Sequence, residues 1–428
     1  MAKNQKTFGL TILFSAMALG TAWAVRGKFG HEQGAAWAGA IGALSILLLA
    51  KREDWYPKFL ISALAAAFGW GLGGMMSYGR IVGYGRSTDF LNVTYGFTML
   101  FIIGALYGLL GGGFFGLALT DSKENRVKWH ILIIEMTAWA IIIYGFLVNQ
   151  LGWLMTPPRS ELWAACLGMG IALVWFLVRN NYHSALRVAV YAGFGAGFGF
   201  AFGNFLQVIG NSLNVPFSMW NVMEYSIGFF GGGGMAYGTF TSSWAKSTKT
   251  QSRQQNLIPI FLLLIFIPFI IWQQSFETER IQKMLANLAV ENVDFWTVLI
   301  GLLAVIPMII FAIYSWRAYY PAGDKKFEAN YRDVQRFFLI YFGIYIFLSW
   351  LITGSVIRFH LPEQWLYLVN FGILLYFVPR QFPGFFEKKI NSFNWLQYFL
   401  LLLLIIALLA LFAVNSHDEV PGSHLRFE

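Results

Sequence analysis

The feature that most constrains this chain is a succession of long apolar runs, thirteen in all, joined by short loops that carry most of the charge. A helix needs about 20 apolar residues to cross a bilayer, and backbone groups in lipid need partners within the protein. The runs therefore predict an all-α, polytopic membrane helical bundle of about 13 transmembrane helices. Their expected bounds are 7–25, 34–50, 59–76, 94–120, 131–153, 162–179, 188–208, 221–241, 257–272, 295–316, 337–354, 365–379 and 395–414.

Composition excludes several other classes of protein. Charged residues make up 12% of the chain, whereas soluble domains carry about 25%. The single cysteine, Cys166, allows no intramolecular disulfide, and the six histidines lack zinc-site spacing. We therefore expect no metal and no cofactor. The net charge of +9 resides in short loops, a pattern of membrane proteins rather than of nucleic-acid-binding proteins, so we expect membrane lipids and no nucleic acid as partners.

The loop charges predict the orientation. With a cytoplasmic N-terminus, the loops on that side hold 21 of the 30 lysines and arginines, and the other loops hold 9. Because cytoplasmic loops are enriched in Lys and Arg, we expect a multi-pass protein of the bacterial inner membrane with its C-terminus outside. The first run resembles a signal peptide but is longer than a typical apolar region of one, and we interpret it as a retained helix.

Glycine divides the chain into two expected domains. Residues 1–256 hold 37 of the 44 glycines, and glycine lets membrane helices approach closely. Residues 1–250 are therefore predicted to form a tightly packed eight-helix core. Residues 257–428, rich in Leu, Ile and Phe, are predicted to form a five-helix flank. An amphipathic pattern near 276–292 predicts a helix lying at the extracytoplasmic interface.

The core also contains an internal sequence similarity. Seven positions between 32 and 48 match positions between 161 and 177 at an offset of 129. Two further sets, 68–73 and 108–113, match at offsets of 126 and 120. We interpret these as a parallel 4+4 repeat with units at about 1–120 and 131–241, although Gly- and Ala-rich helices can also resemble each other by chance.

Polar residues concentrate at three loops of the predicted outer side. Two of them are unusually basic for that side, and the third is rich in amides. The candidate substrate-binding residues are Arg26, Lys28, His31, Glu32, Tyr78, Arg80, Tyr84, Arg86, Asn204, Gln207, Asn211, Trp220, Asn221 and Glu224. Arg26 and Lys28 could instead bind phospholipid phosphates, and Glu32 could simply favour the positive end of its helix dipole. Glu135, an intramembrane carboxylate, is a candidate for proton coupling.

These features favour a secondary transporter of a small hydrophilic solute, anionic or sugar-like. The basic residues would attract the anion, and the amides would hydrogen-bond to it. The alternative is a membrane-embedded transferase or hydrolase that acts on a lipid-linked or extracytoplasmic substrate, with His31 as general base and Glu32 or Glu224 orienting it. A structural subunit of a larger complex is a third possibility. A one-sided pocket with His31 bonded to a carboxylate would favour the enzyme, and a path or two gates would favour the transporter.

Overall fold

The computed structural model describes residues 2–246, 253–320, 327–389, 391–418 and 420–427, and within these ranges the regular secondary structure is helical. The first part contains α1 (Ala2–Arg26), α2 (His31–Ala50), η1 (Glu53–Lys58), α3 (Phe59–Gly73), α4 (Gly79–Tyr84), α5 (Phe90–Thr120), α6 (Trp129–Tyr144), η2 (Gly145–Gln150), α7 (Trp163–Arg179), α8 (His183–Ser212) and α9 (Met219–Phe240). The second contains α10 (Arg253–Phe261), η3 (Leu262–Phe266), α11 (Ile267–Ser275), α12 (Thr278–Asn287), α13 (Val293–Tyr319), α14 (Tyr331–Ile352), α15 (Pro362–Phe377), η4 (Val378–Arg380) and α16 (Ser392–Val414).

Each of the thirteen predicted apolar runs coincides with a helix. In the described ranges, nine helical segments are long and apolar enough to cross a membrane, which indicates a multi-pass membrane protein. The remaining runs correspond to α3, α7, α9 and α15. With 15 residues, α3 is roughly 22 Å long, short of the ~30 Å hydrocarbon core. Thirteen crossings therefore remain a prediction.

Local sequence signals explain several helix boundaries. The side chain of Asp89 accepts a hydrogen bond from the backbone N–H of Asn92 and caps α5. Asn330 and Asp333 form a reciprocal capping box at the start of α14. At the other end of a helix, Lys51 adopts a left-handed conformation, with φ of 47°, and terminates α2. The side chains of Asp89, Asn330 and Asp333 satisfy backbone donors that the start of a helix leaves without partners.

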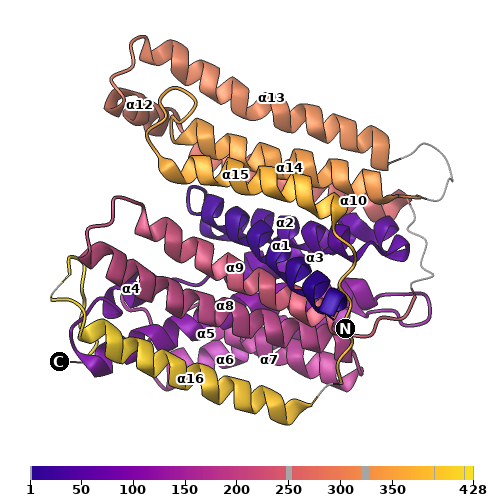
Figure 1. The fold of residues 1–428 in the computed structure, drawn as a ribbon, viewed down its shortest axis with the longest axis horizontal. Helices are drawn as coiled ribbons and strands as arrows, with labels where there is room; N and C mark the ends of the chain where they lie inside the picture. Colours follow the sequence, from indigo (N-terminus) through magenta and orange to yellow (C-terminus); the bar gives the residue numbers. More distant parts are fainter. Residues whose placement is uncertain (1, 247–252, 321–326, 390, 419, 428) are drawn as a thin grey trace.

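The long helices run alongside one another in a bundle (Figure 1). α5, α8 and α9 pack side by side, α1 packs against α9, and α2 lies between α1 and α3. α13, α14 and α15 cover one side of this group, whereas α16 lies on the opposite side, against α5 and α8 (Figure 1). The C-terminal part is thus divided between two faces of the core. The extended segment before α16 lies beside the end of α9, where the Phe386 N–H donates to Phe240 O.

Glycines mediate the closest helix contacts at matching positions of the two proposed repeat units. A Cβ on Gly69 of α3 would overlap backbone atoms of Leu110 and Gly111 in α5. A Cβ on Gly195 of α8 would likewise overlap backbone atoms of Phe230 in α9 and would lie 3.4 Å from Cα of Gly231.

These contacts are related by the offsets of 126 and 120 found in the sequence. Gly71 and Gly197 differ, since Gly71 faces Ala36 of α2 whereas Gly197 faces Phe101 of α5. The repeat remains a prediction.

Contacts near the helix ends, within the described ranges, join residues from one predicted side of the membrane at a time. At one end, Lys51 donates to Pro379 O, and Arg187 donates to Lys388 O. At the other end, Arg280 donates to Lys28 O. The chain termini lie at opposite ends of the bundle (Figure 1). The predicted amphipathic helix is observed as α12, which buries Ile281 and Leu285 and is shorter than the expected 276–292.

Candidate functional site

A polar cavity of about 850 Å³ opens at the end of the bundle where α2 begins and α3 ends. The residues around it come from five separate parts of the chain. Its polar and aromatic lining consists of His31, Glu32, Ser77, Tyr78, Arg80, Arg159, Trp220, Glu224 and His424. The structure thus brings together His31, Glu32, Tyr78, Arg80, Trp220 and Glu224 from the predicted set.

The base of the cavity is formed by a buried ion pair. Arg26, the last residue of α1, is 3% exposed, and its Nη1 lies 2.6 Å from Oε2 of Glu224 in α9. Nη1 also donates to the hydroxyl of Tyr78, at 3.0 Å. That hydroxyl donates in turn to Oε1 of Glu224, at 2.9 Å. Burial raises the pKa of Tyr78 well above its ordinary value, so the phenol keeps the proton that it donates.

The second guanidinium nitrogen fixes the tautomer of His31. Arg26 Nη2 lies 3.0 Å from His31 Nδ1 and 3.2 Å from the hydroxyl of Tyr107. Because a guanidinium has donors only, Nδ1 of His31 accepts the hydrogen bond, and the neutral ring carries its proton on Nε2. His31 therefore offers a hydrogen-bond donor at Nε2. This arrangement does not suit a general base, which would need an unprotonated Nε2.

Glycines allow the helix ends around the site to come together. A Cβ on Gly74, which follows α3, would lie 2.5 Å from Cα of Glu32, so α3 reaches the first turn of α2 only with glycine there. A Cβ on Gly34 would lie 2.9 Å from Cγ of Arg26. Gly34 thus leaves space for the Arg26 side chain beside the α2 backbone.

A C-terminal segment completes the rim. His424 N–H donates to Gly83 O, at 3.1 Å, and Asn92 Nδ2 donates to His424 O, at 2.8 Å. The His424 Nδ1 lies 3.2 Å from Nη1 of Arg80. Burial, followed by the nearby charges of Arg80 and Arg86, lowers the pKa of His424. The ring is therefore neutral at pH 7.

The electrostatic balance of the lining favours an anion. Arg26 and Glu224 neutralise each other. Of the other charged residues in the lining, Arg80 and Arg159 are cationic and Glu32 is anionic. Glu32 has no ion-pair partner among the described residues. Arginine offers a planar set of donors that matches a carboxylate or phosphate.

Several predicted cationic and aromatic residues lie outside this cavity. Lys28 is 3.7 Å from Glu363 and thereby ties the first loop to α15. Arg86 stacks over the ring of Trp220, at 5.3 Å, and donates to Pro421 O. Tyr84 is buried. Lys28 and Arg86, two of the predicted substrate-binding residues, therefore lie outside the cavity lining and hold neighbouring segments together.

The predicted substrate-binding amides do not line the cavity. Asn204 donates to Gln207 within α8, at 3.0 Å, and both side chains are buried. Asn221 donates to the hydroxyl of Tyr367 in α15 and to Ala24 O in α1. Asn211 lies near the end of α8, away from the lining. These amides form hydrogen bonds within or between helices, which is the other use of polar side chains in membrane proteins.

Glu135 also lies apart from the cavity. Its Oε1 is 2.8 Å from Nη2 of Arg179, so the partner of this carboxylate belongs to the neighbouring helix α7. The proton-coupling role remains a prediction.

Sequence reasoning missed Tyr107, Arg159 and His424. Tyr107 lies inside a long apolar run, where its hydroxyl was the available signal. Arg159 was one of only nine basic residues on its predicted side. His424 lies beyond the last apolar run, and nothing in its neighbourhood marks it. The described part of the chain contains no cluster of three His, Cys, Asp or Glu residues that could hold a metal ion.

Comparisons with known proteins show no relationship: no protein family, curated protein or solved structure matches the chain.

Proposed function

We propose that the chain is a secondary transporter of a small hydrophilic anion, and that the cavity above Arg26 is its binding site. The observation that carries this proposal is the buried Arg26 guanidinium, which meets Glu224, Tyr78 and His31 at the base of the cavity. An isolated buried cation is costly, and Glu224 compensates it while the site is empty. A substrate carboxylate or phosphate would compete with Glu224 for the same donors.

A second cavity supports transport over simple binding. It has a volume of about 820 Å³ and lies where α2 ends and α14 begins, with Lys51, Tyr331 and Arg332 in its lining. The two cavities thus flank opposite ends of α2, a helix of 20 residues, which is roughly 30 Å long. Both cavities offer cations to a solute.

Stacked aromatic rings lie between α2 and α14. The Trp37 ring of α2 lies parallel to the rings of Tyr341 and Tyr345 in α14, at centroid distances of 4.8 and 4.9 Å. The hydroxyl of Tyr345 donates to Gly34 O, beside Arg26. In our proposal this stack is the closed gate. Displacement of α14 from α2 would open the second cavity, at the end of α2. Alternating access of this kind needs only small rigid-body movement around a fixed site.

Purified protein in liposomes provides the test. Currents on a solid-supported membrane would be recorded after jumps in phosphate, gluconate or glucose concentration. We expect a current with at least one of the two anions and none with glucose. Arg80→Gln and Arg159→Gln should weaken the apparent affinity for that anion, because each removes a cation from the lining.

Arg358→Gln is the matched control, since Arg358 lies on the same predicted side and outside the cavity lining. It should behave as the wild type. Equal loss of current in all three variants, or a current with glucose alone, would contradict an anion site in the cavity.

A membrane-embedded transferase or hydrolase is the second candidate. The observation in its favour is that Glu32 lines the cavity beside His31 without a hydrogen bond to any described side chain. Glu32 could then accept a proton from a water or hydroxyl nucleophile. Under this hypothesis, Glu32→Gln should abolish turnover of an extracytoplasmic phosphate ester while anion-driven currents remain absent in the wild type.

A further inference from the structure

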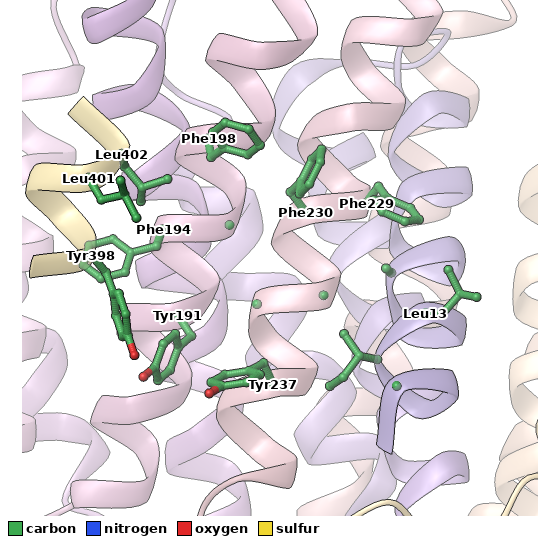
Figure 2. A pocket seen from close by; sticks show the side chains of 16 residues that line it. Leu13, Tyr191, Phe194, Phe198, Phe229, Phe230, Tyr237, Tyr398, Leu401 and Leu402 are labelled. Carbon is green, nitrogen blue, oxygen red and sulfur yellow. The ribbon is translucent and has the colours of Figure 1, made fainter. Parts of the chain in front are cut away.

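We propose that an intramembrane groove between α1, α8, α9 and α16 binds one anionic phospholipid. The groove has a volume of about 650 Å³ and shares no lining residue with either polar cavity. Figure 2 shows the side chains that line it. It lies near the start of α1, α8 and α16 and the end of α9. The occupant would come from the leaflet at that end of the bundle.

Glycines and aromatic rings give the groove the shape and chemistry of an acyl-chain site. A Cβ on Gly9 would meet no atom within 4 Å, and one on Gly233 would make only ordinary contact with Ala16, at 3.6 Å. Space therefore remains beside these backbones. Phe194 and Phe198 form part of the wall (Figure 2). Apolar walls open to the bilayer admit hydrocarbon chains and exclude a hydrophilic solute.

One end of the groove is polar. The hydroxyls of Tyr191, Tyr237 and Tyr398 lie toward the same end, away from the phenylalanines (Figure 2). The Nζ of Lys388 donates to the hydroxyl of Tyr237, at 3.0 Å. Because that hydroxyl accepts a hydrogen bond from Lys388, its own hydrogen is available for a ligand oxygen.

A second cation reinforces this end. The Arg187 guanidinium lies 5.8 Å from the ring centroid of Tyr191, and its Nη1 donates to Lys388 O. Arg187 thereby holds the backbone of the lysine that reaches the groove. The lysine side chain itself is exposed.

Charge complementarity identifies the occupant. Two cations and a tyrosine hydroxyl at the membrane-surface end suit a phosphodiester, and the apolar walls suit its acyl chains. A zwitterionic phospholipid has the same phosphate but adds a cationic group, and the repulsion of that group by Lys388 and Arg187 offsets the attraction of the phosphate. The geometry therefore points to a phospholipid with net negative charge.

Native mass spectrometry of the delipidated protein tests this proposal. Dioleoylphosphatidylglycerol and dioleoylphosphatidylcholine have the same chains and different headgroups, so their difference in apparent Kd reports the polar end alone. We expect tighter binding of phosphatidylglycerol to the wild type. Lys388→Gln should weaken that binding about fivefold, because one cation near the membrane surface contributes ~1 kcal/mol. It should leave phosphatidylcholine binding unchanged.

Two matched controls accompany the variants. Lys389→Gln removes the neighbouring lysine and should retain the preference. Gly233→Leu should fill the groove and weaken binding of both lipids, whereas Gly372→Leu, at a position with nothing within 4 Å of a built Cβ, should not. Equal binding of both lipids to the wild type would overturn the proposal, as would an undiminished preference in Lys388→Gln or equal losses in both glycine variants.

Discussion

At the residue scale, the most consequential interaction is that between Arg26 and Glu224. Both side chains are almost fully buried, and they are 2.6 Å apart. Burying two charges costs desolvation energy, which is recovered only if their remaining hydrogen-bonding groups also find partners. Tyr78, Tyr107 and His31 provide such partners for the two terminal nitrogens of the guanidinium. The pair is therefore part of a network, and removal of one member should affect the others.

Glu224→Gln should destabilise the protein by about 3–5 kcal/mol, because it leaves Arg26 buried without a counter-charge. Thermal unfolding in detergent, followed by tryptophan fluorescence, would measure the loss. The double variant Arg26→Gln/Glu224→Gln should lose less than the sum of the two single variants. Additive losses would show that the two residues do not act as a pair.

His424 should make the docking of the C-terminal segment depend on pH. Its pKa is lowered in the docked state, so the undocked state binds more protons, and docking is fully stable above the ordinary histidine pKa of about 6.5. As the pH falls through the lower, docked pKa, that stability is lost because protonated His424 is repelled by Arg80 and Arg86.

A spin label at position 425, introduced as Leu425→Cys, would report this change. Leu425 is 51% exposed, and the native Cys166 is buried and protected. Label mobility in the paramagnetic resonance spectrum should increase from pH 7 to pH 5. In a His424→Gln background the mobility should stay constant, and a rise there of equal size would exclude the histidine as the cause.

At the element scale, glycine determines which helices can be neighbours. α5, α8 and α9 contact one another where a glycine of one helix faces backbone carbonyl groups of the next. Gly108 faces Ala192, and Gly199 faces Ser226. In a membrane, where burial of apolar surface adds little, such close approach is the main source of helix association. α13, by contrast, has few buried residues and only one glycine, Gly301.

Gly197→Leu should separate α8 from α5. A Cβ on Gly197 would lie 2.7 Å from the Phe101 carbonyl oxygen, a backbone atom that cannot move aside easily. Overpacking of this kind costs about 1–3 kcal/mol or more. Gly145→Leu, where a Cβ would meet nothing within 4 Å, is the matched control. The melting temperature in detergent should fall for the first variant only, and equal melting temperatures would refute the close contact.

At the scale of the whole molecule, two polar cavities lie at opposite ends of one buried helix. The loops near Lys51, Lys123 and Lys388 are predicted to be cytoplasmic, and those near Arg26, Arg80, Asn211 and Glu363 to be outside. Two further loops predicted to be cytoplasmic, near Lys249 and Lys325, lie outside the described residues. This arrangement predicts which side of the membrane each cavity faces.

Labelling of engineered cysteines would establish the sides. In a Cys166→Ala background, Asn211→Cys should react with an impermeant thiol reagent added to intact cells. Lys123→Cys should react only after the cells are opened, because the odd number of predicted crossings between the two positions puts them on opposite faces. Reaction of both positions in intact cells would be incompatible with the predicted topology.

The sequence predicted the helices more closely than the site. Apolar runs locate helices because insertion into lipid depends on hydrophobicity along the chain. They do not specify which way a polar side chain points. Asn204 and Gln207 bond to each other inside α8, whereas His31 and Glu32 line a cavity. The rim residue His424 depends on the docking of a distant segment, which no local pattern reveals.

The ion pair at the base of the cavity joins two residues that the ribosome synthesises at very different times. Arg26 and Glu224 are 198 positions apart in the chain, so at 5–20 residues per second the arginine waits roughly 10–40 s for its partner. During that interval it lies at the end of α1, where a long side chain can reach the phospholipid headgroups. The counter-charge of the buried guanidinium, Glu224, arrives only with α9. The cavity above Arg26 is thus assembled late, after its cation has spent almost half of translation at the membrane surface.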